Sequence, residues 1–376
     1  MNNKKKVLFV ATVVKSHINV FHLPYLKWFK DNGYETHVCA RDDFDGEECI
    51  IPNCDVHYDV PFERLPINIK NLKAYTQLKK IINENEYDII HCNTPVASIL
   101  TRLAAMKARK KGTKVIYTAH GFHFFKGAPL LNWLLYYPAE KICSYFTDVL
   151  ITINKEDYEF AKRKIKARHI DYVPGVGIDT RKFRDTYINK YKKRSELGIN
   201  LDDIVLLSVG ELSKRKNHEV IIRAISQLNN PKLQYLVVGR GPLHNYLKQL
   251  SKDLNIEKNV HLLGFRNDIS EICGVADIFC FPSKQEGLPV SVMEAMASGL
   301  PILCSNIRGN VDLIENGING YLVECRNIEE YKLFIEKLSE DRSMRERISK
   351  INQNKIKLYD IEKIKSMMIR IYKEVL

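Results

Sequence analysis

The sequence contains no apolar run near the roughly 18–20 residues that a membrane-spanning helix requires. Its most apolar stretch, Ala128–Ala139 (APLLNWLLYYPA), is shorter and holds two prolines and an asparagine. None of the nine cysteines forms a C-x-x-C pair, and most lie in strand-like contexts such as HVCAR and IFCFP, where cysteine acts as a small apolar residue. We therefore expect a reduced, cytoplasmic chain that does not cross a bilayer and is not a disulfide scaffold.

Several motifs for nucleotide binding and nucleophilic catalysis are also missing. The chain has no P-loop and no G-x-S-x-G, and Gly239-Arg-Gly241 is too short for a Rossmann fingerprint. The first residues, MNNKKKVLFVAT, have the basic start of a signal peptide, but the apolar stretch is brief and no small-residue cleavage site follows it. This segment is predicted to be a first β-strand.

Positive charge is concentrated in the first half of the chain. Lys and Arg number 58 against 45 Asp and Glu, a formal net charge of +13. Residues 1–194 contain 33 basic and 21 acidic residues, whereas residues 195–376 contain 25 and 24. The basic clusters at 109–111, 162–164 and 192–194 have the chemistry to contact nucleic acid, anionic lipid headgroups or a phosphorylated substrate, and a solvated surface accounts for them equally well.

The 376 residues are enough for two domains. Short Val, Ile and Leu runs alternate with longer amphipathic stretches, which is the pattern of βα units in a parallel sheet. The series stops near Val173–Lys182, where PGVGID supplies a proline and two glycines, and then restarts. Strands are predicted at Val7–Thr12, Thr36–Ala40, Ile89–Cys92, Val115–Thr118, Val149–Ile153, Val205–Val209, Leu236–Val238, Val260–Leu262, Ile278–Phe281 and Ile302–Cys304. We predict an α/β protein of two doubly wound domains, with the carboxyl ends of both sheets at one central cleft.

The stretch PSKQEGLPVSVMEAMASGLP places Glu286 in a strand-to-helix loop and Glu294 eight residues later, inside the helix. Gly287 lets the backbone pass close to a ligand, and Pro289 suits the first helical turn, whose free N–H groups favour a diphosphate. Glu294 can accept two hydrogen bonds from vicinal hydroxyls such as those of a ribose. A bare pair of glutamates at this spacing is more often a surface carboxylate on an ordinary amphipathic helix.

Four histidines and a D-x-D tripeptide are further candidates for site residues. His120, in TAHGFHFF, follows the fourth predicted strand at the ligand end of the sheet, which favours a functional role. Asp43-Phe44-Asp45 falls in a polar loop away from any expected donor site, so we do not expect it to bind metal. His17, His22 and His123 lack metal-ligand spacing with a carboxylate or cysteine, which favours surface or packing roles.

Glu286-x7-Glu294 inside EGLPVSVMEAMASGLPIL resembles the signature of the retaining family 4 glycosyltransferases, which have the GT-B fold. Further matches extend over almost the whole chain: VGELSKRKN, LVVGRGP, VPGVGIDTRKF, TAHGFHFF and FHLPYLKWF. The pattern is most similar to the subgroup that builds bacterial capsular and exopolysaccharide repeat units. The resemblance implies an acceptor-binding Rossmann-like domain over residues 1–178, with a C-terminal helix of about 360–376 packing back on it, and a nucleotide-sugar-binding domain over 179–359.

The resemblance also implies roles for particular residues. Glu294 would hold the ribose, Lys216 would neutralise the diphosphate, and His120 would contact the donor sugar. Glu286 would hold the sugar hydroxyls and the distal phosphate together with the backbone of Gly287, Leu288, Pro289 and Val290, and the base would lie near Gly239, Gly241 and the Gly264–Arg266 loop. The predicted catalytic residues are thus His120, Lys216 and Glu286, and the predicted acceptor-binding residues are Lys15, His17 and Lys126.

Two departures from the family pattern affect these assignments. Glu211 stands where the family commonly has arginine, so either Lys214 or Arg215 substitutes for that cation or less charge is neutralised. The first loop, ATVVKSHIN, lacks the paired glycines that many members use near the phosphate.

The expected activity is transfer of a sugar, with retention, from a UDP-sugar to a polyprenyl-diphosphate-linked saccharide at the cytoplasmic membrane face. No metal cofactor is expected, since lysine and a helix N-terminus would stabilise the leaving diphosphate. Ala128–Tyr137 would either dip into the membrane interface or form a buried core helix. The alternatives are another activity on the same donor, such as a sugar-nucleotide epimerase, and a non-enzymatic nucleic-acid binder, which the absence of a nucleic-acid motif disfavours.

Overall fold

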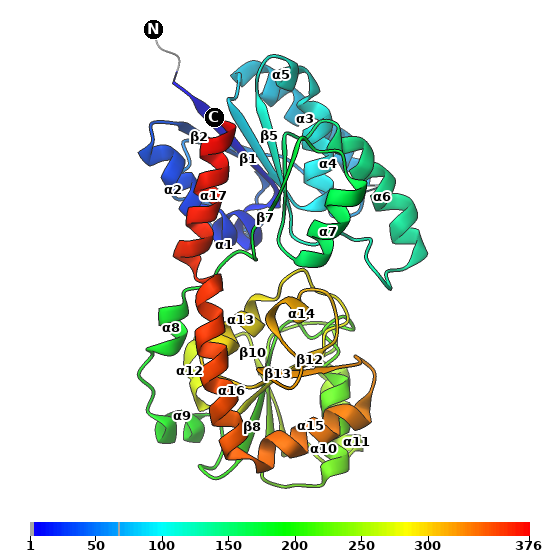
Figure 1. Cartoon of the computed structure of the whole chain (residues 1–376), viewed down its shortest axis with the longest axis vertical. Coiled ribbons are helices and arrows are strands. Elements are labelled where there is room, and N and C mark those ends of the chain that lie inside the picture. The colour runs from blue at the N-terminus through cyan, green and yellow to red at the C-terminus, as the bar shows by residue number, and fades with distance from the viewer. Residues whose placement is uncertain (1–3, 67) are drawn as a thin grey trace. The chain divides into compact units, whose positions relative to one another are not determined.

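Two parallel β-sheets organise the part of the chain that the computed structural model describes, residues 4–66 and 68–376. Each sheet lies in its own unit (Figure 1). The first unit comprises residues up to Val176 together with Ile364–Leu376, and the second comprises Gly177–Lys363.

The first unit contains a seven-stranded sheet in the order β3-β2-β1-β4-β5-β6-β7. Its strands are β1 (Lys6–Val13), β2 (Glu35–Arg41), β3 (Val56–Asp59), β4 (Ile89–Asn93), β5 (Lys114–Ala119), β6 (Val149–Thr152) and β7 (His169–Tyr172). The central strand β1 is buried almost throughout, as expected for a parallel strand covered on both faces. The helices are the π-helix η1 (Val14–Ile18) and α1 (Asn19–Phe21), α2 (Leu23–Asp31), α3 (Lys70–Asn85), α4 (Pro95–Ala104), α5 (Met106–Lys110), α6 (Leu130–Ser144) and α7 (Lys155–Lys164).

The C-terminal helix α17 (Ile361–Val375) packs on the first unit. Figure 1 shows it in red beside α2. The hydroxyl of Tyr372 lies 2.9 Å from Nδ1 of His91 on β4, and its ring stacks on Trp28 of α2 with centroids 5.9 Å apart. Because Ile364, Met368 and Tyr372 are all buried, this helix completes the core on one face of the sheet.

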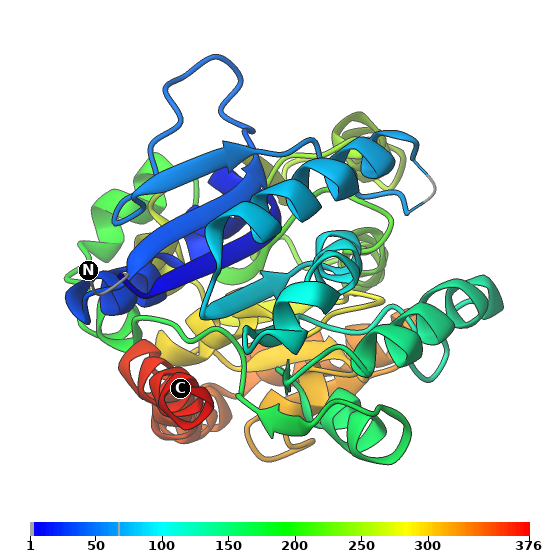
Figure 2. The same ribbon diagram turned by 90° about the horizontal axis from the view of Figure 1, so that it is seen from above.

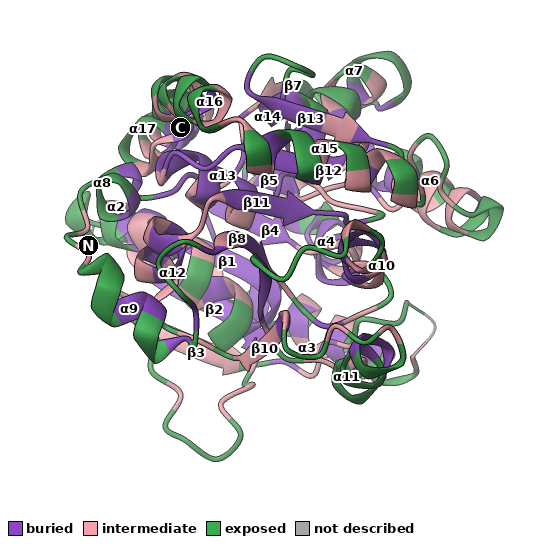
Figure 3. Ribbon diagram, turned by 90° about the horizontal axis from the view of Figure 1, so that it is seen from below, coloured by how far each residue is buried: buried purple, intermediate pink, exposed green. Residues whose placement is uncertain are grey.

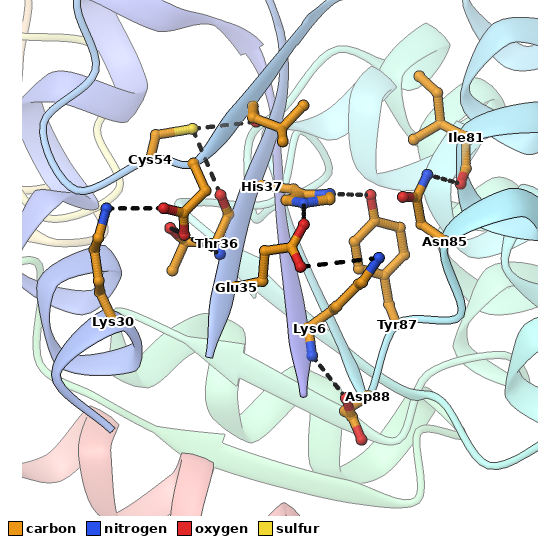
Figure 4. A network of polar contacts seen from close by, with 12 residues as sticks. Lys6, Lys30, Glu35, Thr36, His37, Cys54, Ile81, Asn85, Tyr87 and Asp88 are labelled. Atoms are coloured by element: carbon orange, nitrogen blue, oxygen red, sulfur yellow. Dashed lines mark hydrogen bonds and ion pairs between the residues drawn. The ribbon is translucent and has the colours of Figure 1, made fainter. Parts of the chain in front are cut away.

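Polar side chains close the amino ends of β1 and β2, as Figure 4 shows. Nε2 of His37 lies 2.7 Å from Glu35 Oε1, and its Nδ1 lies 2.7 Å from the hydroxyl of Tyr87. The backbone N–H of Lys6 donates to Asp88. Since this network occupies the amino end of the sheet, where α/β proteins do not usually place their ligands, we assign it to stability.

Helix α6 has one buried and one exposed side. Its Glu140 accepts a hydrogen bond of 2.8 Å from Arg102 of α4, and both side chains are buried. Arg102 also stacks on the ring of Tyr117, 4.1 Å from its centroid. Breaking such a buried pair typically costs about 3–5 kcal/mol, so this contact fixes α6 on the unit.

The opposite side of α6 exposes four leucines to solvent. Leu130, Leu131, Leu134 and Leu135 are between 50% and 74% exposed. Trp133, Tyr136 and Tyr137 instead pack against the core of the unit. In Figure 2 the helix extends away from the sheet, and Figure 3 shows exposed residues along its length. The expectation of a buried core helix over Ala128–Tyr137 is therefore correct only for the side that carries Trp133, Tyr136 and Tyr137.

The second unit contains a six-stranded sheet in the order β10-β9-β8-β11-β12-β13. Its strands are β8 (Ile204–Val209), β9 (Leu233–Val238), β10 (Val260–Gly264), β11 (Ile278–Phe281), β12 (Ile302–Ser305) and β13 (Gly320–Val323). Its helices are α8 (Thr180–Arg184), α9 (Lys190–Glu196), α10 (Glu219–Leu228), α11 (His244–Asp253), α12 (Ile269–Val275), α13 (Val290–Ala297), α14 (Asn310–Leu313), α15 (Ile328–Glu340), α16 (Arg342–Lys355) and the 3-10 helix η2 (Ile356–Tyr359). Within the described residues, no helix combines the length and apolarity needed to span a bilayer.

Candidate active site

One carboxylate oxygen joins two loops at the carboxyl ends of β8 and β11 in the second unit. Oε1 of Glu286 accepts hydrogen bonds from Arg215 Nη1 at 2.7 Å, Lys216 Nζ at 2.8 Å and Ser283 Oγ at 2.6 Å. The Glu286 side chain is 12% exposed. Because charge-assisted hydrogen bonds are the stronger ones, this contact holds the β8 loop against the loop that leads into α13.

Lys216 is the more buried of the two cations. Its side chain is 11% exposed, and Nζ lies 4.4 Å from the centroid of the Phe281 ring. Burial lowers the pKa of Lys216, and the neighbouring Glu286 carboxylate opposes that shift. The ring face and the carboxylate both favour the ammonium form of Lys216.

Glycines allow the surrounding loops to approach one another closely. A Cβ on Gly239, which has a φ of 148°, would lie 2.0 Å from the carbonyl oxygen of Gly210, and one on Gly241 would lie 2.5 Å from the Leu212 carbonyl oxygen. The structure therefore gives Gly239 and Gly241 a packing role against the β8 loop. A contact with a base remains a prediction for these residues.

A second close approach supports the loop before α13. Gly309 has a φ of 81°, and a Cβ there would lie 2.2 Å from the carbonyl oxygen of Gly287. Nε of Arg308 donates to the carbonyl oxygen of Glu286 at 3.2 Å. Gly309 and Arg308 thus hold the main chain of Glu286 and Gly287 in place. Pro289 precedes Val290, the first residue of α13.

Glu294 lies inside α13 without a polar partner. Among the described residues, the structure records no hydrogen bond or ion pair for its carboxylate. Burial raises its pKa from the ordinary 4.5 to about 7, and the charge of Lys182 opposes this. A partly buried carboxylate of this kind has both oxygens available for hydroxyl groups of a ligand.

Two other predicted donor residues, Arg266 and Lys214, differ from Arg215 in their contacts. Arg266 is bound to carboxylates of its own unit: Nη2 lies 2.6 Å from Glu196 Oε1, and Nε lies 2.8 Å from Asp268 Oδ1. Lys214 is exposed and lines a cavity of about 380 Å³ on another part of the loop. Of the two cations considered as substitutes for the missing arginine, the structure brings Arg215, and not Lys214, to Glu286 and Lys216.

In the first unit, histidines gather at the carboxyl ends of the strands. The ring centroids of His17 and His120 lie 5.1 Å apart, and those of His17 and His22 lie 5.2 Å apart. Burial lowers the pKa of His17 and His22 well below 6.5 and that of His120 to about 4, so the imidazoles are neutral. Sequence spacing gave no sign of this grouping, because His120 comes from a different loop. Of the surface and packing roles expected for His22, its burial agrees with the packing role.

The remaining residues considered in the first unit lie outside that group. Lys15 forms an ion pair of 2.7 Å with Glu47, and the side chain of Lys126 is exposed. The ring of His123 lies against that of Tyr136, tilted by 30° with centroids 4.6 Å apart. Asp43 of the D-x-D tripeptide accepts hydrogen bonds from the backbone N–H groups of Lys15 and Ser16, which is a structural role at the start of η1.

Comparison with known proteins identifies the family of this chain. The family described as glycosyl transferases group 1 matches residues 189–355, and the one described as glycosyl transferase 4-like matches residues 6–154. The putative glycosyltransferase EpsD of Bacillus subtilis is 41% identical over 338 residues, which cover 89% of this chain and 87% of EpsD. The chain belongs to the family 4 glycosyltransferases.

Two further comparisons agree with this assignment. An Escherichia coli enzyme named UDP-Gal:alpha-D-GlcNAc-diphosphoundecaprenol alpha-1,3-galactosyltransferase is 33% identical over 296 residues, which cover 77% of this glycosyltransferase and 75% of that enzyme. The crystal structure of Anabaena HepE in complex with UDP has a TM-score of 0.81 and 21% identity, over 98% of this chain and 100% of HepE. The likeness shows the GT-B fold. The family and the fold predicted from the Glu286–Glu294 motif are both confirmed.

The raised pKa of Glu294 predicts a pH-dependent effect of neutralising it. Its carboxyl group holds a proton more tightly in the folded glycosyltransferase than in the unfolded chain, so stability is lost as the pH rises from about 4.5 through 7. Glu294→Gln should therefore stabilise the fold by up to about 3 kcal/mol at pH 8 and by much less at pH 5. Urea unfolding at the two pH values measures the difference.

The exposed Glu336 of α15 provides the matched control. Glu336→Gln should shift the unfolding midpoint equally little at both pH values. An equal shift by Glu294→Gln at pH 5 and pH 8 would show that the Glu294 carboxylate is not under strain from burial.

Proposed function

We propose that this glycosyltransferase moves a sugar from a UDP-sugar to a polyprenyl-diphosphate-linked saccharide during assembly of a cell-surface polysaccharide, with retention at the anomeric carbon. The observation that carries the proposal is the arrangement around α13. Two cations meet at Glu286 before the helix begins, and the unpartnered carboxylate of Glu294 lies further along the same helix. A nucleoside diphosphate sugar offers the complementary groups in the same order: sugar, diphosphate, ribose.

The cations have a defined role in the proposed reaction. As the bond from the anomeric carbon to the diphosphate breaks, negative charge collects on the leaving phosphate, and the sugar carbon becomes oxocarbenium-like. Lys216, Arg215 and the first-turn N–H groups of α13 are fixed before the reaction begins, so they stabilise this charge with little reorganisation. In the free protein, the Glu286 carboxylate neutralises the charges of Lys216 and Arg215. Once a diphosphate binds to these two cations, Glu286 would be released and would accept hydrogen bonds from the sugar hydroxyls.

The choice of substrates rests on relatives. The name of the Escherichia coli enzyme specifies UDP-Gal and a diphosphoundecaprenol acceptor, and HepE was crystallised with UDP. In this chain, the acceptor would contact the first unit, where His17 and His120 lie together and where Lys15 and Lys126 add positive charge. A lipid-linked acceptor also accounts for the basic excess in residues 1–194.

The exposed face of helix α6 supports the proposed contact with the membrane. Its four exposed leucines form one face, and Lys126 and Lys141 are exposed near the two ends of that face. Leucines enter the acyl boundary of a bilayer while lysines bind anionic headgroups, which is the pattern of an interfacial helix. We place the enzyme at the cytoplasmic face of the membrane as a peripheral protein, held there in part by α6.

Lys216→Ala tests the assignment of the diphosphate site. Removing one preorganised cation should lower the turnover number about 10²–10³-fold and affect donor binding less, because leaving-group charge develops only in the transition state. Turnover is measured with UDP-sugars and a synthetic polyprenyl-diphosphate saccharide, and the anomeric configuration of the product is read by NMR. An epimerised sugar nucleotide without transfer would support the rival activity.

Two controls accompany this assay. Lys284→Ala removes an exposed lysine from the α13 loop and should leave turnover close to that of the unmodified enzyme. EDTA should not reduce turnover, because protein cations supply the positive charge. Unmodified turnover in Lys216→Ala, or activity that depends on added Mg²⁺ or Mn²⁺, would contradict the proposed site.

The Leu131→Glu, Leu134→Glu double variant tests the membrane contact. Each leucine that enters the bilayer contributes about 1.5–3 kcal/mol, so the variant should bind phosphatidylglycerol-containing vesicles at least 10-fold more weakly in a sedimentation assay. Leu333→Glu on α15, where Leu333 is 55% exposed, is the matched control and should bind as the unmodified protein does. Equal binding by the double variant would remove α6 from the proposed interface.

A further inference from the structure

Arg308 is a buried cation outside the Glu286–Glu294 motif. It lies in the loop between β12 and α14 of the second unit, and only 6% of its surface is exposed. Its Nε donates to the main-chain carbonyl oxygen of Glu286 at 3.2 Å. Arginine is almost never buried to this extent unless it is paired. The contact with Glu286 is therefore part of how the two loops are built.

Hydrogen bonds at both ends hold the loop that carries Arg308. The backbone N–H of Asn306 donates to the Val323 carbonyl oxygen of β13 at 2.7 Å. Nδ2 of Asn310, whose side chain is fully buried, donates to the Ser305 carbonyl oxygen at 2.8 Å. Because both ends of the loop are attached to the sheet, Arg308 extends from a fixed support.

Gly309 brings the same loop into contact with the residue after Glu286. Its φ of 81° favours glycine, and a Cβ there would lie 2.2 Å from the carbonyl oxygen of Gly287. Two consecutive residues of one loop thus contact two consecutive residues of the other. This pairing fixes the main chain at the point from which the Glu286 side chain extends.

Glu286 is therefore held by different elements at its side chain and at its main chain. Its Oε1 accepts hydrogen bonds from the two cations of the β8 loop, whereas its main-chain oxygen accepts one from Arg308. Lys216 has further supports of its own, because its backbone N–H donates to the Ser213 carbonyl oxygen and its Nζ lies over the Phe281 ring. Loss of the Arg308 contact would thus displace Glu286 more than Lys216.

We propose that Arg308 is a positioning residue that sets the orientation of Glu286 toward the donor sugar and thereby determines which sugar is transferred. The inference rests on the proposed transfer from a UDP-sugar, in which Glu286 accepts hydrogen bonds from the sugar hydroxyls. A hydroxyl of inverted configuration does not reach a fixed acceptor, and a site built to bind a hydroxyl rejects a sugar that leaves its acceptor unpaired. Discrimination between epimers therefore requires that Glu286 be held in place.

The same arrangement predicts which part of the donor depends on Arg308. UDP carries the ribose and the diphosphate but no sugar. In the proposed site, Glu294 on α13 and Lys216 on the β8 loop bind those two groups, whereas Arg308 supports the loop before α13. Binding of UDP should thus be nearly independent of Arg308, and steps that involve the sugar should depend on it.

Arg308→Met tests this role, because it removes the donor groups and keeps much of the side-chain volume. UDP binding is measured by calorimetry, and transfer to the polyprenyl-diphosphate saccharide is measured with two epimer pairs, UDP-glucose and UDP-galactose, and UDP-GlcNAc and UDP-GalNAc. The unmodified enzyme should favour one member of a pair by at least about 10-fold in kcat/KM. Arg308→Met should lower kcat/KM for the favoured sugar about 10²-fold, as expected for a misplacement of about 1 Å, and bring the ratio within the pair close to one. The Kd for UDP should change by less than about 3-fold.

Two further variants separate positioning from a general effect on structure. Arg308→Lys should recover part of the sugar preference, because its ammonium group can still donate to the Glu286 carbonyl oxygen. Arg347→Met, at an exposed arginine of α16, is the matched control and should behave as the unmodified enzyme does. Circular dichroism establishes that each variant is folded, and Arg308→Gln takes the place of Arg308→Met if the latter is not.

Three results would overturn the inference alone: an unmodified enzyme that does not discriminate within either pair, an unchanged ratio in the folded Arg308 variant, or a loss of UDP binding as large as its loss of turnover. The last of these would show a structural role for the whole site. Absence of UDP binding by the unmodified enzyme would instead overturn the proposed function, and this inference with it.

Discussion

The hydrogen bonds that Oε1 of Glu286 accepts hold together the two loops next to the start of α13. Arg215, Lys216 and Ser283 all donate to it, so the loop after β8 and the loop after β11 are held together by one acceptor. Helix α13 begins at Val290, four residues after Glu286, and the position of Glu294 in turn depends on that start. The eight-residue spacing therefore puts Glu294 on the helix whose start this contact positions.

The charges of Lys216, Glu286 and Glu294 connect this arrangement to the proposed function. Burial lowers the pKa of Lys216, and the Glu286 carboxylate 2.8 Å away opposes that shift in the free protein. A diphosphate that binds at the same place would replace the Glu286 carboxylate as the neighbouring anion. The charges of Lys216 and Arg215 would then be neutralised both with and without the ligand. Glu294 contrasts with Glu286, because among the described residues no cation forms an ion pair with its carboxylate, and burial raises its pKa to about 7. One glutamate is held by protein groups, and we propose that the other binds the ligand.

Much of the fold could be predicted because it depends on local patterns. The strand predicted at Val205–Val209 is β8, Ile204–Val209, and the one predicted at Ile278–Phe281 is β11 with the same bounds. The grouping of His17, His22 and His120 could not be predicted, since it depends on a π-helix and on a strand about a hundred residues away. Arg266 was expected near a base, but sequence alone does not show its partners Glu196 and Asp268. The half-exposed state of α6 depends likewise on the distant contact between Arg102 and Glu140.

Isothermal titration of UDP into the unmodified protein and into Glu286→Gln tests the central claim most directly. If Glu286 is the internal anion that occupies the diphosphate cations, its neutralisation should tighten UDP binding by about 10-fold, since opposite charges at this range interact by more than about 1.4 kcal/mol. Transfer from a UDP-sugar should fall in the same variant, because the sugar hydroxyls lose a charged acceptor with two oxygens and keep only one neutral amide oxygen. Unchanged or weaker UDP binding, or undiminished transfer, would contradict the account.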